Sequence, residues 1–319
     1  MTLPDGLYAA GVAALALGVD LLVGDPQGWP HPVRLIGAGL DRLETLADRA
    51  APQTAPSRRK LFGAACVLLM AGGSWFAART LCGLPAAGGL LALYLAYAGL
   101  SLGGLLAEAR KAEELIESGD LKAARKAVGM LVSRETGHLD AAALRRALAE
   151  TTAENVNDGF TAPFFYLVIG GPALLWAYKA VSTMDSMWGY LTPRYKDLGL
   201  ACARTDDVLA FIPARLTALA FMAAAVLAGR GEKGMFRRIR RDAAKSKSPN
   251  AGWPMAAGAW TAGASMGGRA VYFGQASEKP VLGPPGVPWN RERLALLRRL
   301  SLAASLGLAS CLMLVRSFL

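Results

Sequence analysis

The sequence predicts an all-α fold: a polytopic helical membrane protein with an amphipathic helical layer on its cytoplasmic side. Hydrophobic residues make up 53% of the 319 residues and charged residues only 18%, which is too apolar for an ordinary soluble domain of this size. Strand-like alternation is nearly absent, and several runs approach the roughly 20 apolar residues that cross a bilayer core. These runs are residues 7–23, 62–82, 86–106, 161–181, 209–228 and 300–319.

The first three runs differ in quality. Residues 7–23 contain Asp20, which must face protein or water rather than lipid. No basic stretch precedes this run and no small-residue cleavage site follows it, so we expect a retained helix and not a signal peptide. Residues 62–82 and 86–106 are separated only by the letters GLPA and are expected to form a tight helical hairpin.

Residues 107–158 are expected to form a soluble helical insertion, because apolar residues recur there at helical spacing. Gly119 and Gly137 divide the insertion into at least three helices. Asp120 and Asp140 are suited to cap the second and third of them. Gly159 stands where a glycine commonly ends a helix.

The later runs are interrupted. The letters IGGP at the centre of residues 161–181 predict a broken or re-entrant helix. Residues 209–228 contain Pro213 and Arg215. Residues 246–263 read as a polar turn entering a close-packed or re-entrant helix. Residues 274–293 are rich in Pro and Gly and are expected to be a loop. We treat residues 1–319 as one integral-membrane domain.

The net charge of +11 is concentrated in a few segments. Residues 229–250 form a basic segment, and smaller basic groups occur at residues 58–60 and 291–299. Cytoplasmic loops retain such an excess of Lys and Arg, which predicts a bacterial cytoplasmic (inner) membrane location with these loops inside. Binding to anionic membrane lipid and binding to phosphate explain the basic segment about equally well. A nucleic-acid partner is not expected, because no reading motif accompanies the charge.

The four cysteines are scattered and follow no metal-binding spacing. We expect neither zinc nor a disulfide framework.

An acidic ridge is the first candidate for chemistry. Glu150, Glu154 and Asp158 stand four residues apart, which places them on one face of a helix, with Asn155 on the adjacent row. The plain alternative to a functional site is that this face of the helix is simply exposed to water. The ridge runs directly into an apolar segment, however, and like charges at this spacing repel. A divalent cation such as Mg²⁺ would relieve the repulsion and could bridge substrate phosphates.

Three other stretches carry polar residues beside apolar runs. The rigid loop at residues 24–32 presents Asp25, His31 and Arg34, although a lone histidine is as often structural as catalytic. The acids at 206 and 207 immediately precede an apolar run, so this pair also fits a helix N-terminal cap. Arg215 requires a carboxylate or phosphate partner. The remaining members of these stretches are Lys179, Asp185, Asp206, Asp207, Ser248 and Asn250.

Seven blocks in one order resemble the adenosylcobinamide-phosphate synthase family, the CbiB/CobD-type membrane enzymes of cobalamin biosynthesis. The resemblance covers about residues 15–285. The blocks are GDPQGWPHPVRLIG, SRETGHLD, ETTAENVNDGFTAPFFY, YKAVSTMDSMWGY, RTDDVLAFIPARLTA, SPNAGWPMAAGAW and YFGQASEKPVLG.

The resemblance implies an ATP-dependent amide ligation. The carboxylate of adenosylcobyric acid, a corrinoid, would join the amine of (R)-1-amino-2-propanol O-phosphate or a similar amino-alcohol phosphate. ATP is then a co-substrate, Mg²⁺ is inferred, and no tightly bound cofactor is expected. The biosynthetic context also allows a homo-oligomer or a complex with other corrinoid-assembly enzymes.

The charge pattern suggests a role for each residue within that reaction. Glu154 and Asp158, helped by Glu150 and Asn155, would hold Mg²⁺, and His31 would act as a general base. Asp185, Asp206 and Asp207 would form a second acidic group. The residues assigned to phosphate or substrate binding are Asp25, Arg34, Asn155, Lys179, Asp206, Arg215, Ser248 and Asn250.

Two other classes of protein stay open. A non-catalytic membrane regulator, similar to AmpE-type proteins, would have less need of clustered acids. A small-molecule transporter would explain the broken apolar runs. The chain has no GxxxxGK[ST] phosphate loop, so the ATP site is unassigned.

Overall fold

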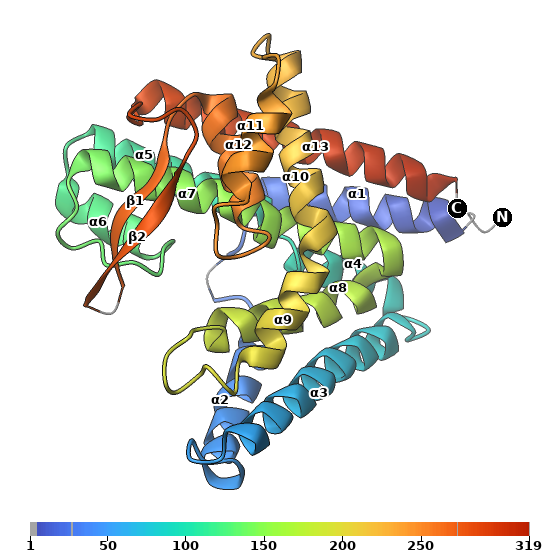
Figure 1. The fold of residues 1–319 in the computed structure, drawn as a ribbon. Helices are drawn as coiled ribbons and strands as arrows, with labels where there is room; N and C mark the ends of the chain where they lie inside the picture. Colours follow the sequence, from blue (N-terminus) through green and yellow to red (C-terminus); the bar gives the residue numbers. More distant parts are fainter. Residues whose placement is uncertain (1–4, 27, 273, 319) are drawn as a thin grey trace. The chain divides into compact units, whose positions relative to one another are not determined.

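The computed structural model describes residues 5–26, 28–272 and 274–318 (Figure 1). Five helices or joined helices within these residues are long and apolar enough to cross a membrane. A sixth is added if the bent pair α9 and α10 is one span. The chain is therefore a polytopic helical membrane protein, as the sequence predicts. Gln27, Phe273 and Leu319 belong to predicted motifs or runs but lie outside the described residues.

The chain forms two compact units, each built from segments that are separate in the sequence. The division into one membrane domain with an insertion at 107–158 and a basic segment at 229–250 stays a prediction. Unit 1 consists of residues 1–101, 162–210 and 312–319, and unit 2 of residues 102–161 and 211–311.

Unit 1 contains a helical hairpin that packs against a long, broken helix. Helices α3 and α4 are joined by a short turn, which confirms the predicted hairpin, and α3 packs on α8 and α9. Gly63 allows α3 to approach the 189–199 loop, because a Cβ there would lie 2.1 Å from the backbone oxygen of Leu198. The helices of unit 1 are α1 (Asp5–Val23), α2 (Pro32–Ala50), α3 (Pro56–Cys82), α4 (Gly88–Ala98), α8 (Ala162–Trp188) and α9 (Leu200–Leu209).

The predicted break in the fourth apolar run is present within α8. Gly170 has φ −134° and ψ 20°, and Gly171 has φ +66° and ψ −167°, neither of which is helical. Pro172 follows and cannot donate to the preceding turn. The predicted run at 86–106 is also interrupted, since α4 ends at Ala98 and the next helix begins at Leu102.

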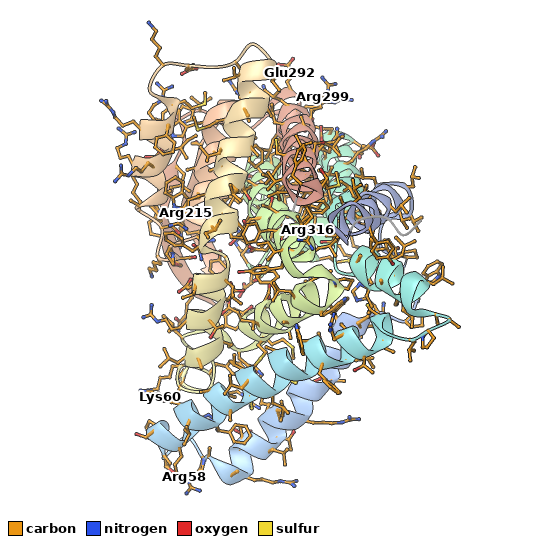
Figure 2. All side chains as sticks on the ribbon, turned by 90° about the vertical axis from the view of Figure 1, so that its right-hand side faces the viewer. Arg58, Lys60, Arg215, Glu292, Arg299 and Arg316 are labelled. Atoms are coloured by element: carbon orange, nitrogen blue, oxygen red, sulfur yellow. The ribbon has the colours of Figure 1, made fainter. Side chains whose placement is uncertain are left out.

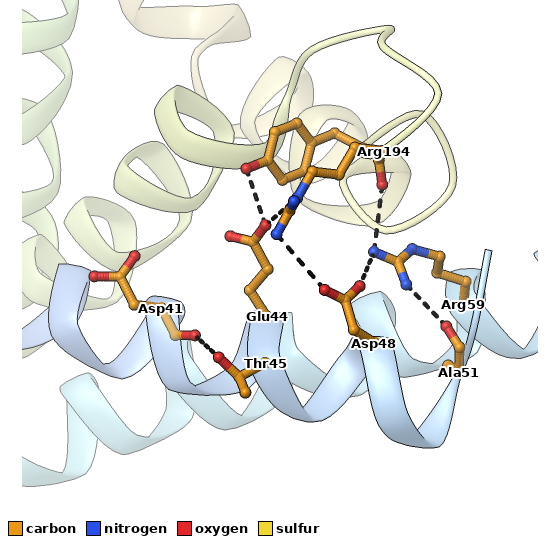
Figure 3. A network of polar contacts seen from close by, with 8 residues as sticks. Asp41, Glu44, Thr45, Asp48, Ala51, Arg59 and Arg194 are labelled. Carbon is orange, nitrogen blue, oxygen red and sulfur yellow. Dashed lines mark hydrogen bonds and ion pairs between the residues drawn. The ribbon is translucent and has the colours of Figure 1, made fainter.

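A polar network joins α2, α3 and the 189–199 loop in unit 1 (Figure 3). Arg59 is 1% exposed and donates hydrogen bonds of 2.9 Å to the backbone oxygen of Ala51 and to Asp48. Arg194 donates to Glu44 at 2.5 Å and forms an ion pair with Asp48 at 3.6 Å. Of the basic group at residues 58–60, the central arginine is thus buried, while Arg58 and Lys60 stand at the first turn of α3 (Figure 2).

Unit 2 is a helical layer around a core rich in alanine. Asp120 accepts a hydrogen bond from the backbone N–H of Ala123 at 3.0 Å and Asp140 from that of Ala143 at 2.8 Å, which confirms both predicted caps. Its elements are α5 (Leu102–Glu117), α6 (Leu121–Gly129), α7 (Ala141–Asn155), the π-helical turn η1 (Val156–Thr161), α10 (Phe211–Leu227), α11 (Met235–Ala243), α12 (Gly252–Ala262) and most of α13 (Arg291–Ser317).

Small residues make α12 the centre of unit 2. The helix packs against α7, α10 and α11. A Cβ at Gly258 would lie 2.9 Å from the Cβ of Ala153 on α7. Of the two alternatives predicted for residues 246–263, the close packing is confirmed.

The expected loop at residues 274–293 is wrong in its first part. Strand β1 (Met266–Tyr272) pairs antiparallel with β2 (Gln275–Leu282), and the hairpin lies alongside α7 (Figure 1). Tyr272 pairs with Gln275, and Gly274 has φ +75°, a conformation that glycine adopts easily in tight turns. The letters QASEKPVL lack alternation because most of this strand is partly or fully exposed. Pairing with β1, and not an amphipathic pattern, creates the strand.

Candidate functional site

The acidic ridge lies in unit 2, where α7 passes into η1. The prediction that the helix ends at Gly159 is wrong, because the chain continues through the π-helical turn into α8. A π turn inserts one extra residue per turn, and such turns occur often at functional sites. Glu150 and Glu154 therefore lie on α7, whereas Asp158 lies on the π turn.

Glu150 is held by two partners from distant parts of the chain. The residue is 2% exposed, and its carboxylate forms a buried ion pair with Arg134 and accepts a hydrogen bond of 2.7 Å from the backbone N–H of Gly267. Burial alone would lower the pKa of Arg134. The neighbouring Glu150 carboxylate outweighs burial and raises that pKa. Arg134 is therefore charged at every ordinary pH, and Glu150 is its counter-ion.

Glu154 and Asp158 form the accessible end of the acidic group. Both side chains are partly exposed, and their negative charges act on each other. Lys279 on β2 supplies an attractive charge to Glu154, with a further contribution from Arg134. The site thus combines two accessible carboxylates with two cations in a partly buried setting.

Amide side chains position the acidic group. Asn157 donates a hydrogen bond of 2.7 Å to Asp158 and accepts one of 3.1 Å from the hydroxyl of Thr217 on α10. Asn155 donates to the hydroxyl of Thr151 at 2.9 Å, and its amide oxygen is therefore turned away from that contact. These bonds fix the π turn between α7 and α10.

The predicted three-carboxylate metal site is not formed. Within the part of the chain that the structure describes, no three His, Cys, Asp or Glu side chains are grouped so that they could hold a metal ion. The physical reason is that Glu150 already binds Arg134 and Gly267 with its two oxygens. Glu154 and Asp158 remain as the carboxylates that could contact a cation.

Arg215 joins α10 to the 248–250 turn, also within unit 2. It donates hydrogen bonds of 2.7 Å to the side chain of Asn250 and 3.1 Å to the backbone oxygen of Pro249. Its guanidinium lies 3.6 Å from the centre of the Phe211 ring. Ser248 accepts hydrogen bonds from the following backbone at 3.2 Å. In place of the predicted carboxylate, the described residues thus give this arginine an amide and the backbone oxygens of Phe211 and Pro249. Its phosphate-binding role stays a prediction.

In unit 1 the structure brings four predicted residues together. His31 caps α2, and its Nδ1 accepts a hydrogen bond of 3.2 Å from the backbone N–H of Val33. Asp25, Lys179 and Arg34 all act electrostatically on its imidazole. Burial lowers the pKa of His31, so the ring is neutral at physiological pH.

The second acidic group is only partly assembled. Asp185 on α8 and Asp206 on α9 both interact electrostatically with the thiol of Cys202, whereas Asp207 interacts electrostatically with Arg204. Neighbouring residues on a helix point about 100° apart, which separates the paired acids. They also lie in the last turn of α9 (Leu200–Leu209), so the N-terminal cap alternative is wrong.

A model of the CobD/Cbib protein family matches residues 13–301. The chain belongs to the CobD/Cbib family. A relative from Geobacter metallireducens, named cobalamin biosynthesis protein CobD, is 39% identical over 285 residues, which are 88% of each chain. Relatives with the same name from Chromobacterium violaceum and Klebsiella pneumoniae are 40% and 38% identical. They cover 87% and 83% of this chain and 88% and 84% of their own. No solved structure matches the chain.

The predicted site residues of this CobD/Cbib chain divide between the two units. Unit 2 holds Glu150, Glu154, Asn155, Asp158, Arg215, Ser248 and Asn250, and unit 1 holds Asp25, His31, Arg34, Lys179, Asp185, Asp206 and Asp207.

Sequence reasoning missed the cations of the acidic group. Arg134 lies in the block SRETGHLD and Lys279 in the block YFGQASEKPVLG, so both fall within the motifs that resemble the CobD/Cbib family. Membership of a block was the available signal. Gly267 was missed because its role is a backbone N–H donor, which no side-chain pattern reveals.

Proposed function

We propose that this chain acts in cobalamin biosynthesis as an integral-membrane ligase. It would join the carboxylate of adenosylcobyric acid to the amine of (R)-1-amino-2-propanol O-phosphate, or a similar amino-alcohol phosphate, with ATP hydrolysis. The observation that carries the proposal is membership of the CobD/Cbib family over residues 13–301. The resemblance of seven ordered sequence blocks to the adenosylcobinamide-phosphate synthases supports the specific reaction.

The chemistry of amide formation explains why a site would need charges of both signs. A carboxylate is a poor electrophile until one of its oxygens is converted into a leaving group, commonly by phosphorylation. The developing charge is stabilised by fixed cations and hydrogen-bond donors. In unit 2, Arg134 and Lys279 supply positive charge beside Glu154. This arrangement supports an anionic substrate at the acidic group.

Two carboxylates are enough for Mg²⁺ that also binds substrate phosphates. Glu154 and Asp158 fit this role, and the amide oxygen of Asn155 is a further ligand of the type that Mg²⁺ accepts. The ion would neutralise phosphate charge when bound. Glu150 would not be a ligand but would hold Arg134 in position.

His31 fits the proposed base in its protonation state but not in all of its geometry. A neutral imidazole can accept a proton, and burial keeps His31 neutral. Because Nδ1 accepts from the Val33 N–H, the neutral ring carries its proton on Nε2, and the lone pair that could take a proton from the substrate ammonium is the one used in the cap. His31 would therefore act as a base only when the hydrogen bond to Val33 opens. Asp25, Arg34 and Lys179 would bind substrate around it.

The proposal is tested by turnover of the purified protein in nanodiscs. Adenosylcobyric acid, aminopropanol phosphate, ATP and Mg²⁺ are supplied, and mass spectrometry reads the corrinoid. We expect a mass gain that matches amide formation and depends on ATP. Glu154→Ala and Asp207→Ala should each reduce turnover at least a hundredfold, and the exposed Glu114→Ala on α5 serves as the control.

Other outcomes would redirect the assignment. Full activity in both variants would refute the residue roles. A folded protein that forms no product would favour a regulator, and uptake of substrate into proteoliposomes without conversion would favour a transporter. The predicted inner-membrane location, with basic loops on the cytoplasmic side, is tested by the accessibility of single cysteines introduced at residues 118 and 182.

A further inference from the structure

A second feature of unit 2 is a pocket beside the acidic group. It is bounded by the loop before α7, the first half of α7 and strand β1, and has a volume of about 600 Å³. This lies within the range of small-molecule sites. The ionisable side chains that line it are Arg134, Glu135, His138, Arg146 and Arg269.

The lining is strongly basic. Three arginines and a histidine face one carboxylate, Glu135, which accepts a hydrogen bond of 2.7 Å from the backbone N–H of Gly274. Arg134 is balanced by Glu150. Among the described residues, neither Arg146 nor Arg269 forms an ion pair within 4.0 Å, even though Glu278 stands opposite Arg269 in the hairpin register. The pocket therefore carries uncompensated positive charge.

Buried donors in the pocket lack acceptors. The side chain of Arg134 is 8% exposed, and one of its terminal nitrogens binds Glu150. Its Nε, and the Nε of Arg146, have no hydrogen-bond acceptor in the part of the chain that the structure describes. Burying an N–H donor without an acceptor is costly, and a charged donor is the costliest kind. An anion in the pocket would satisfy both.

The backbone of β1 passes close to Arg146. Gly268 has φ +83°, a conformation that other residues rarely adopt, and a Cβ there would lie 3.5 Å from a terminal nitrogen of Arg146, an ordinary contact distance. The strand therefore reaches the guanidinium at a position that favours glycine.

We propose that this pocket binds the phosphate group of a small-molecule substrate, as a phosphate ester or a polyphosphate. Guanidinium groups from three segments match the several acceptor oxygens and double charge of a phosphate better than a single carboxylate. The inference rests on the proposed function, in which ATP and the amino-alcohol phosphate both carry this group. Arg134 would then join the phosphate to the acidic group, since it contacts Glu150 and lines the pocket.

The test measures binding without turnover. The full-length protein in phosphatidylcholine nanodiscs is titrated calorimetrically with inorganic phosphate, aminopropanol phosphate and ATP, each alone and with no corrinoid. Arg146→Gln, Arg269→Gln and the double variant are compared with Arg145→Gln. The control changes the adjacent residue of α7, whose side chain pairs with Glu117 at 2.7 Å and does not line the pocket. Thermal unfolding shows whether each variant is folded.

We expect the single variants to raise Kd roughly tenfold to a hundredfold, the effect of losing one charge-assisted hydrogen bond, and the control to leave it within about twofold. If the variants bind only ATP more weakly, the pocket is assigned to the polyphosphate. If they bind only aminopropanol phosphate more weakly, it is assigned to the phosphate ester. Unchanged Kd values for all three probes, or no binding by the wild-type protein, would overturn the proposal.

The result is separable from the proposed function. Binding that depends on the arginines, in a protein that makes no amide, would refute only the ligase. Amide formation with unchanged phosphate binding in the folded variants would refute only the pocket.

Discussion

Removal of the Glu150 carboxylate gives the most direct test of the buried ion pair in unit 2. In Glu150→Ala, Arg134 would remain as a charge with an 8% exposed side chain, and the Gly267 N–H would lose its acceptor. Breaking a buried pair on one side costs about 3–5 kcal/mol, because the remaining charge is uncompensated. The unsatisfied N–H would add about 1 kcal/mol or more. We therefore expect a loss of about 4–6 kcal/mol.

A double-mutant cycle separates this pairing from a general loss of packing. Arg134→Met in the Glu150→Ala background removes the orphaned charge and should recover part of the stability, with a coupling energy of about 2 kcal/mol or more. Glu150→Gln keeps the acceptor for Gly267 and should cost less than Glu150→Ala.

The assay is equilibrium unfolding of the detergent-solubilised protein by titration with a denaturing detergent, read by tryptophan fluorescence. A coupling energy below about 0.5 kcal/mol would mean that the two side chains do not act as a pair. A loss below about 1 kcal/mol in Glu150→Ala would show that the carboxylate is solvated. Either result would refute the reasoning.

Three further predictions follow from other contacts. Gly63→Ala should destabilise unit 1 by about 1–3 kcal/mol, because a Cβ would meet a backbone carbonyl oxygen at 2.1 Å. Gly72→Ala on the same helix has open space and should be neutral or stabilising, and equal stabilities of the two variants in thermal unfolding would contradict this reasoning. Stability should fall as pH drops from about 6.5 through the lowered pKa of His31, because the unfolded chain binds the proton more readily and protonation removes the acceptor for Val33. His31→Asn keeps a cap and should flatten this loss of stability between pH 7 and 5, whereas equal slopes of stability against pH in the two proteins would argue against it. Asp242→Ala should lower stability by about 2–4 kcal/mol, because this carboxylate is 1% exposed, accepts two hydrogen bonds and forms ion pairs with Lys245 and Arg241. An unchanged melting temperature would show that those contacts are not formed.

The features that the sequence predicted correctly depend on neighbours along the chain. Apolar runs identified the membrane helices, Asp120 and Asp140 were placed correctly as caps, and the two glycines before Pro172 marked the break in α8. Each of these depends on residues within one or two turns.

The features that the sequence did not reveal depend on residues far apart. The π turn at Asp158 could not be anticipated, because its polar contacts include Thr217, 60 residues from Asn157. The strand at residues 275–282 exists because β1 pairs with it, although its own pattern is polar and irregular.

The candidate site shows the same division. The sequence alone determined which acids share one face of the helix, because residues four apart in a helix lie one above the other. Only the tertiary structure decided what each acid does. Glu150 meets Arg134 and the Gly267 N–H, which lies 117 residues away, and is used for structure, while Glu154 and Asp158 stay accessible. A buried charge takes the counter-charge that folding brings to it, and no local pattern specifies that partner.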